Sequence, residues 1–278
     1  MVEAVKLSEL ANRKRRNDDV AEEEDSELDI SSTDSENEEG GEGADDDKEE
    51  IVNIDFDFYN ANPDIDFQAL KNLSRQLFGP QESNKIQLSA LADLMLASPM
   101  TTIKTDGTES DPYCFISFID YKENRNSDYA KYLDKLDTRL STFFRTIENS
   151  NDKNCALVVS ERLINMPPEV VPPMYKITLD DIKTSANGGK EHFDFYVIVS
   201  RKYEVNFDTD DSTTARSSKR VKNDEVDYFH EEDRFFEKYA QVQFQTEPRK
   251  GVISTYTIIG HDGLVYAIQD LEKEIAKW

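Results

Sequence analysis

The chain has 278 residues and a formal net charge of −25 at pH 7. A negative excess on this scale repels the phosphates of DNA and RNA, which argues against direct nucleic-acid binding and favours basic proteins as partners. The sequence contains no stretch of about 18 consecutive apolar residues and no signal-peptide pattern at its start. We therefore expect a soluble, intracellular protein that does not insert into membranes.

Residues 17–50 hold most of the negative charge. They carry eighteen carboxylates and one lysine, but no aromatic residue and only three large apolar ones, Val20, Leu28 and Ile30. Such a segment cannot bury enough apolar surface to offset the entropy lost on ordering it. We expect residues 1–50 to form a disordered acidic tail that attracts basic proteins without selecting among them.

Two compact basic clusters indicate nuclear entry. The first comprises Arg13, Lys14, Arg15 and Arg16, and the second, within a polar insert at about residues 206–224, comprises Lys219, Arg220 and Lys222. Nuclear import receptors bind short basic runs of this kind in extended form. The first cluster can also fold back onto the acidic tail, and the two interpretations are compatible.

Four hydroxyl side chains of the tail are phosphorylation candidates: Ser26, Ser31, Thr33 and Ser35. Each has a carboxylate three residues further along, which is the pattern that acidophilic kinases prefer. Each phosphate would add roughly −1.5 to −2 charges. Phosphorylation would therefore strengthen the attraction to a basic partner.

Residues 51–278 contain nearly all of the aromatic residues, and their length suits a single domain. Strands are predicted over residues 52–58, 113–119, 155–159, 193–203, 242–245 and 252–259. Helices are predicted over residues 64–78 (capped by Asp64 and Asp66 and ended by Gly79 and Pro80), 88–97, 127–147, 173–184, 227–240 and after 263. The imperfect alternation predicts an α/β (α+β) fold with a mixed central sheet of about six strands covered by helices.

The helix at residues 88–97 carries Leu88, Leu91, Leu94 and Leu96. Their spacing fits the pattern by which nuclear export receptors bind an amphipathic segment. It also fits a helix of the core, which we favour because an export signal needs exposed leucines.

Two proline pairs lie five residues apart in residues 161–175. Proline is unfavourable inside helices and central strands, so this segment is predicted to be a rigid, extended connection that offers apolar contacts at low ordering cost. The candidate contacts to a client protein are Met166, Pro167, Pro168, Val170, Val171, Pro172, Pro173 and Met174. The alternative is that these residues pin the connection to the core.

Motifs that would indicate catalysis are absent from the sequence. It has no phosphate-binding loop, dinucleotide fingerprint, nucleophile elbow, CxxC or HExxH. The acidic residues that follow His230 could suggest a metal or acid–base site, but we favour stabilisation of a helix start by the macrodipole, which needs no further function. His261 is predicted to be a turn residue, and Cys114 and Cys155 to be buried free cysteines. We expect no catalytic, cofactor or metal site.

The folded part resembles the eukaryotic BCCIP family. The resemblance is carried by residues 52–59, 75–78, 91–94, 111–115 and above all 157–175, which read LVVSERLINMPPEVVPPMY. It extends from about residue 51 to the C-terminus, and the length and acidic tail are most similar to the fungal members. The resemblance implies a nuclear protein of ribosome biogenesis and transport, whose fungal relatives escort a basic large-subunit ribosomal protein and assist export of a lipid kinase.

The same resemblance implies a core similar to the GNAT acetyltransferases. That fold binds acetyl-CoA through an R/Q-x-x-G-x-G/A loop, which this sequence lacks. Gly188 and Gly189 form the only glycine pair of residues 51–278, without an upstream Arg or Gln at the required offset. We expect the fold to serve as a scaffold without the cofactor loop.

The leading hypothesis is a non-enzymatic nuclear chaperone for a basic ribosomal protein of the large subunit. Its further partners would be nuclear import and export receptors and a phosphoinositide kinase. The alternatives are an acetyltransferase with an atypical cofactor loop and a histone chaperone, which the acidic tail would serve equally well.

Overall fold

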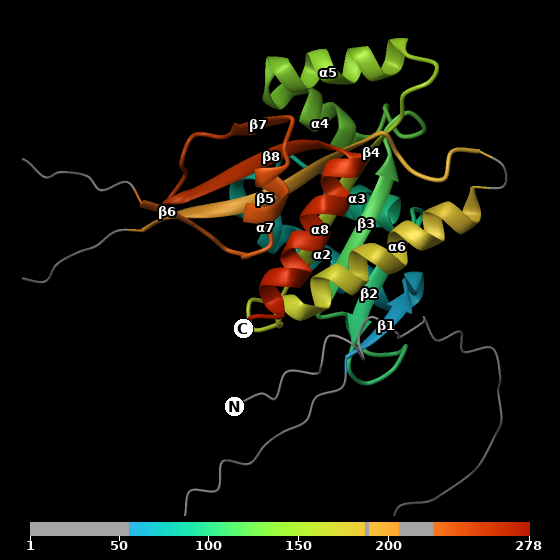
Figure 1. Ribbon diagram of the computed structural model, residues 1–278, viewed down its shortest axis with the longest axis vertical. Helices are drawn as coiled ribbons and strands as arrows, with labels where there is room; N and C mark the ends of the chain where they lie inside the picture. The colour runs from blue at the N-terminus through green and yellow to red at the C-terminus, as the bar shows by residue number, and fades with distance from the viewer. Residues whose placement is uncertain (1–55, 187–188, 206–224) are drawn as a thin grey trace, which may run out of the picture.

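The computed structural model describes residues 56–186, 189–205 and 225–278 (Figure 1). Its strands are β1 (Asp57–Asn60), β2 (Met100–Lys104), β3 (Cys114–Asp120), β4 (Cys155–Arg162), β5 (Phe195–Val205), β6 (Glu225–Tyr228), β7 (Val242–Gln245) and β8 (Val252–Gly260). They form one sheet in the order β1-β2-β3-β4-β5-β8-β7, with β6 also paired to β5. Every pair is antiparallel except β4 with β5. The predicted mixed sheet is confirmed, with eight strands in place of about six.

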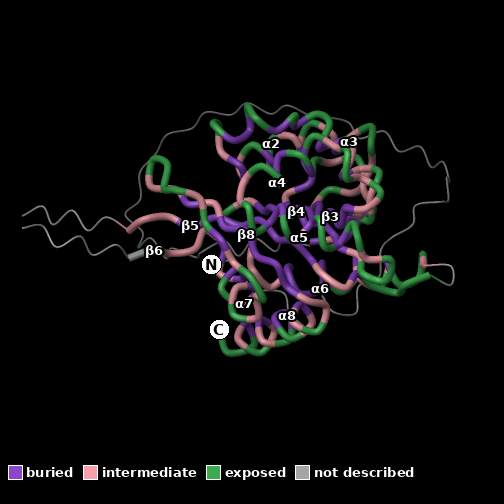
Figure 2. The backbone as a smooth tube through the Cα atoms, turned by 90° about the horizontal axis from the view of Figure 1, so that it is seen from above, coloured by how far each residue is buried: buried purple, intermediate pink, exposed green. Residues whose placement is uncertain are grey.

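Helices cover both faces of this sheet, as the view in Figure 2 shows. One face carries α2 (Pro63–Ser83), α3 (Leu88–Leu96), α4 (Asp128–Leu136) and α5 (Thr138–Asn149). The other face carries the short 3₁₀ helix η1 (Pro168–Val170), α6 (Val171–Ser185), α7 (Asp233–Lys238) and α8 (His261–Ile275).

The sheet has an apolar core on each face, and alternate side chains of the strands point into one or the other. In β3, Phe115 and Ile119 join the core beneath α2–α5, whereas Ile116 and Phe118 join the core beneath α6–α8. Successive side chains of a strand point to opposite faces, so an apolar strand can fill both cores only if each face is covered. This is why β3 and β4 read as nearly continuous apolar runs.

Two strands of the sheet, β2 and β6, were not predicted from the sequence. All five residues of β2 are buried, so it shows no polar–apolar alternation, and it ends at Lys104, whose ammonium pairs with Asp66 at 2.7 Å with both side chains fully buried. The predicted helix at residues 227–240 was too long, because β6 takes its first part and α7 only residues 233–238.

Helix boundaries also differ from the prediction. Asn62, not Asp64 or Asp66, caps α2, since its side chain accepts a hydrogen bond from the Asp64 amide. Gly79, with φ of 70°, interrupts α2, but the chain resumes helical form to Ser83. The predicted helix at residues 127–147 is two helices, because Asp137 is extended and caps α5 through the Arg139 amide at 2.7 Å.

Candidate functional site

The parallel strands β4 and β5 diverge near the middle of the sheet. Their pairing ends at Val158 with Ile198, and from Lys202 onward β5 pairs with β6. In open sheets, ligands bind where neighbouring strands separate at their carboxyl ends. The divergence is therefore a candidate binding site.

A cluster of buried charged side chains fills this divergence. Glu161 of β4 accepts hydrogen bonds from Arg201 of β5 at 2.7 Å and from His230 Nε2 at 2.6 Å. Arg162, the next residue of β4, holds the carboxylate of Glu232 through two bonds of 2.9 and 3.0 Å. We call these five residues the buried ion-pair cluster.

Burial and the neighbouring charges shift the pKa values of two carboxyl groups, Glu232 in the cluster and Asp233 beside it. Burial raises the pKa of Glu232, but the hydrogen bonds and charge of Arg162 outweigh it and hold the pKa below its usual range. The adjacent Asp233 is also buried and lies beside the charges of Glu232 and Glu161, and its pKa is raised well above the usual value. Glu232 is thus stabilised as a carboxylate and Asp233 as the neutral acid.

The cluster leaves little free space where β4 and β5 diverge. The remaining cavity has a volume of about 20 Å³ and is lined by cluster residues together with Tyr175 and Phe236. A cavity of this size holds about one water molecule. A molecule as large as acetyl-CoA does not fit in this cavity.

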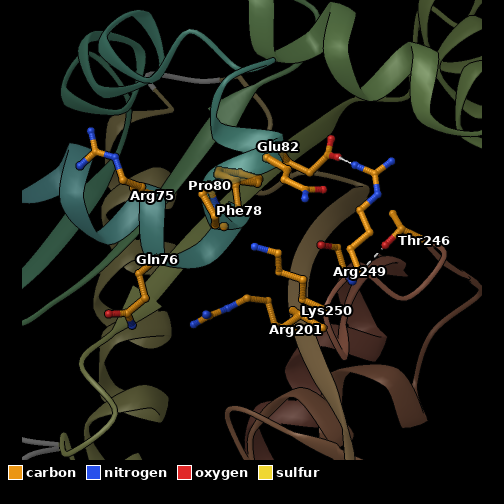
Figure 3. A pocket seen from close by; sticks show the side chains of 13 residues that line it. Arg75, Gln76, Phe78, Pro80, Glu82, Arg201, Thr246, Arg249 and Lys250 are labelled. Carbon is orange, nitrogen blue, oxygen red and sulfur yellow. Dashed lines mark hydrogen bonds and ion pairs between the residues drawn. The ribbon is translucent and has the colours of Figure 1, made fainter.

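A larger cavity of about 330 Å³ lies beside the cluster, between the interruption of α2 and the turn that joins β7 to β8 (Figure 3). Four cationic side chains line it, namely Arg75, Arg201, Arg249 and Lys250, together with the carboxylate of Glu82 and the apolar Phe78, Pro80 and Val252. We call it the basic pocket. Arg201 is shared, because it lines both the basic pocket and the filled divergence.

Two of the four cations of the basic pocket have a carboxylate partner and two do not. Arg249 forms an ion pair with Glu82, and Arg201 pairs with Glu161 at 2.7 Å. Within the described residues, neither Arg75 nor Lys250 has a carboxylate within 4.0 Å, and both are exposed. Lys250 extends into the pocket, whereas the guanidinium of Arg75 is turned towards Asn72 (Figure 3).

A tight turn positions Lys250. Arg249 and Val252 exchange both backbone hydrogen bonds across it, at 2.8 and 3.1 Å, and its two central residues, Lys250 and Gly251, have φ of 54° and 76°. Positive φ at both positions is the signature of a type I′ hairpin turn, where Asn-Gly is the preferred pair. Lysine at the first position costs conformational energy, and such strain is found preferentially at functional sites.

The proline segment is not the extended connection that the sequence predicted. Pro168 begins η1, and Pro172 and Pro173 lie in the first turn of α6, where a missing N–H costs no helical hydrogen bond. Of the candidate client contacts, Met166, Val170, Val171, Pro172, Pro173 and Met174 are buried, and Pro167 and Pro168 are half-buried. In this structure they pin the segment to the core and do not offer an exposed apolar face.

The leucines of α3 also belong to the core. Leu88 and Leu91 are buried, and Leu94 and Leu96 are half-buried and pack against the same cluster of apolar side chains. The prediction of a core helix is confirmed. A receptor could not bind these leucines as an export signal without opening the fold.

Several predicted sites lie outside the described residues. These are the basic clusters Arg13, Lys14, Arg15, Arg16 and Lys219, Arg220, Lys222, and the phosphorylation candidates Ser26, Ser31, Thr33 and Ser35. The acidic run of residues 17–50, the insert at 206–224 and Gly188 also lie outside them. They remain predictions.

The cysteines and two of the histidines lie in the core, in the buried ion-pair cluster or at the start of a helix. Cys114 and Cys155 are free and buried, as predicted. His230 belongs to the buried ion-pair cluster, and His261, predicted as a turn residue, begins α8 with its ring stacked on His192 at 3.8 Å. The part of the chain that the structure describes contains no group of three or more potential ligands that could hold a metal ion.

No pattern in the sequence predicted the basic pocket. Arg249 and Glu82, which form an ion pair, lie 167 positions apart in the chain, and no local sequence pattern predicts a contact at that separation. The only available signal was the Lys250-Gly251 pair before a predicted strand, which is typical of a hairpin turn but says nothing about what the turn faces.

The fold and the site define an α+β protein whose strand divergence is filled by ion pairs and whose cationic pocket is open beside it. In its described residues, no helix has both the length and the apolar character needed to cross a membrane.

Comparison with known proteins agrees with this description. Residues 51–236 match the BCCIP family model. Protein BCP1 of Candida glabrata is 66% identical over the whole of both chains, and Protein BCP1 of Saccharomyces cerevisiae is 68% identical over 82% of this chain and 84% of the relative. The crystal structure of BCP1 from Saccharomyces cerevisiae superposes with a TM-score of 0.72 at 64% identity, covering 84% of this chain and 94% of that one. The chain belongs to the BCCIP family.

Proposed function

We propose that this chain is a non-enzymatic nuclear chaperone that binds and shields a basic large-subunit ribosomal protein during ribosome biogenesis. It would also assist the nuclear export of cargo such as a lipid kinase. The acidic run supplies the attraction for a basic client, and the folded domain supplies the selection.

The observation that carries this proposal is the net charge of −17 in residues 17–50. A free ribosomal protein exposes basic surface that is meant for RNA, and a dense run of carboxylates screens it within a Debye length of about 8 Å at physiological salt. Membership of the BCCIP family supports the same assignment.

Client affinity at low and high salt tests the proposal in the full-length chain. The comparison variant replaces the carboxylates of residues 17–50 by their amides, so that length is kept and charge is removed. We expect the variant to lose the salt-sensitive part of the affinity for a basic large-subunit ribosomal protein and to keep a salt-tolerant part. Loss of all binding at every salt concentration would contradict this division.

Competition distinguishes the proposed client from histones, which the same charge would attract. Core histones added in equimolar amount at moderate salt should fail to displace the ribosomal protein. Displacement at equal concentration would favour the histone chaperone.

Calorimetry with acetyl-CoA tests the non-enzymatic assignment. The filled divergence of β4 and β5, with its cavity of about 20 Å³, supports the expectation of no binding. Micromolar binding would revive the acetyltransferase alternative.

Microscopy of a fluorescent fusion tests nuclear entry. Replacing the cations of both basic clusters by alanine should shift the fusion from the nucleus to the cytoplasm. A fusion that stays nuclear would contradict the assignment of Arg13–Arg16 and Lys219–Lys222 to import.

A further inference from the structure

The basic pocket carries positive charge that the described residues do not neutralise. Arg75 donates a hydrogen bond to the neutral Asn72 at 2.9 Å, and Lys250 has no acidic partner there. In Figure 3, Lys250 extends into the space between Pro80 and Arg201. On a chain with a net charge of −25, this is a local exception that favours an anionic occupant.

Arg201 also lines the pocket, although its guanidinium is bonded to the buried ion-pair cluster. Its Nη2 is used by Glu161, but its Nε is buried and has no hydrogen-bond partner in the described residues, and only 9% of the residue is exposed. Buried donors are nearly always bonded in folded proteins. Because this Nε atom has almost no accessible surface, a ligand in the pocket would reach it only after the Arg201 side chain rearranged.

The walls of the pocket are apolar as well as cationic. Phe78 and Pro80 of α2 and Val252 of β8 line it. Its volume of about 330 Å³ lies at the lower end of the range typical of ligand sites. The matching ligand therefore combines carboxylates with aliphatic side chains, and a short acidic peptide has this chemistry.

The chain itself contains a segment with that chemistry. Residues 27–30 read Glu-Leu-Asp-Ile, and they hold two of the three large apolar residues of the acidic run. In an extended peptide, alternate side chains point to opposite sides. The segment thus offers two apolar side chains, Leu28 and Ile30, to match the apolar wall and two carboxylates, Glu27 and Asp29, to match the cations.

The length of chain allows this contact. Twenty-six positions separate Ile30 from Phe56, the first described residue, and a flexible coil of that length spans roughly 25 to 30 Å. From Pro63 to Phe78, α2 covers on the order of 22 Å. A fully extended chain of the same length spans up to roughly 90 Å, so the length of chain allows residues 27–30 to reach the pocket at the far end of α2.

We propose that the basic pocket is a docking site for residues 27–30 of the same chain. Docking couples the acidic run to the folded domain at one place, although most of its carboxylates remain free. The assignment does not depend on the proposed client and is tested in its absence.

Site-specific photocrosslinking in the full-length chain tests the docking. Because Cys114 and Cys155 are buried, at 1% and 0% exposure, a Ser26→Cys substitution supplies a readily labelled thiol. Labelling with a benzophenone maleimide, irradiation at physiological salt and peptide mapping should place the cross-links mainly in residues 75–82 and 246–254.

Two double variants separate docking from diffuse attraction. Leu28→Ser with Ile30→Ser keeps every charge, and Arg75→Glu with Lys250→Glu reverses the free cations. Each should lower the pocket cross-links at least about tenfold, equivalent to about 1.4 kcal/mol. The matched control, Lys131→Glu with Arg145→Glu, makes the same charge change at exposed positions of α4 and α5 and should leave the cross-links unchanged.

Three outcomes would overturn the proposal. They are cross-links scattered over the surface, pocket cross-links that survive the Leu28 and Ile30 substitutions, and an equal loss in the control variant. A mixture of isotopically light and heavy chains shows whether residues 27–30 dock on their own chain or on a second copy. Cross-links that join a light chain to a heavy chain would mean that the pocket binds residues 27–30 of a second copy. Unfolding curves confirm that each variant is folded.

Discussion

Two neighbouring groups of charges, the buried ion-pair cluster and the basic pocket, meet at Arg201 and behave in opposite ways. In the cluster, Glu161 and Glu232 are buried and each is held by arginine. In the pocket, Arg75 and Lys250 are exposed and have no acidic partner within the described residues.

This difference in burial and pairing indicates that the buried ion-pair cluster stabilises the fold, whereas the exposed cations of the basic pocket can bind a ligand. A buried charge is tolerated only when it is paired, so the cluster's side chains are committed to one another and fill the space between β4 and β5. An exposed cation needs no partner, and Arg75 and Lys250 are therefore free for a ligand. Four substitutions test this comparison.

Glu161→Ala should have the largest effect. It leaves Arg201 and His230 buried without their carboxylate, which typically costs about 3–5 kcal/mol of the free energy of unfolding. Urea denaturation measures it. The control is Glu274→Ala, which removes an exposed partner of Lys277 and should cost less than about 1 kcal/mol. Similar costs for the two variants would contradict the structural assignment of the cluster.

Asp233→Asn should raise stability at neutral pH. Burial and the charges of Glu232 and Glu161 raise the pKa of Asp233 in the folded state well above 3.8. The folded chain then holds a proton that the unfolded chain releases, so this contribution to stability is present below pH 3.8 and is lost as the pH rises. Asparagine removes that loss, which amounts to about 1.4 kcal/mol for each unit of pKa shift.

Unfolding measured from pH 4 to pH 7 checks this prediction. The Asp233→Asn variant and the native chain should be similar near pH 4 and should separate towards pH 7. Asp262→Asn changes an exposed aspartate in the first turn of α8 and serves as the control. This control should change the free energy of unfolding by no more than about 1 kcal/mol at any pH, and a curve for Asp233→Asn that runs parallel to that of the native chain would refute the prediction.

Glu82→Gln, a substitution in the wall of the basic pocket, should lower the free energy of unfolding by an intermediate amount. Burial raises the pKa of Glu82, but hydrogen bonds from Lys85 at 2.8 Å and Tyr132 at 2.9 Å, with the charge of Arg249, outweigh it and lower the pKa. The stability this provides is present above pH 4.5 and is lost as the pH falls. We expect a cost of about 1–2 kcal/mol at pH 7 that shrinks in acid. A cost that is independent of pH would exclude the charge as its cause.

Lys250→Asn should have the smallest effect, and it should be stabilising. Asparagine suits the positive φ of 54° at this position, so we expect a gain of roughly 0.5–1 kcal/mol in the free energy of unfolding. The control Gly251→Ala, at φ of 76°, should lower stability by about 1 kcal/mol. A loss of stability in Lys250→Asn would show that the lysine side chain itself supports the turn.

Local sequence patterns predicted much of the fold. Apolar runs located β3, β4, β5 and β8, and the leucines of α3 were correctly assigned to the core. The prediction failed for β2, which is buried throughout and lacks alternation, and for the proline segment. Proline at the start of a helix and proline in an extended connection look alike in sequence, because only the packing that follows decides whether the helix forms.

By itself, the sequence determined the mixed fold class, the family, and the concentration of negative charge in residues 17–50. These depend on composition and on patterns within short stretches of chain. Only the tertiary structure decided that the proline segment is buried, that ion pairs fill the divergence of β4 and β5, and that Arg75 and Lys250 line the same pocket. The physical reason is that burial and ion pairing depend on which side chains the folded sheet and helices bring together, and those residues lie far apart in the chain.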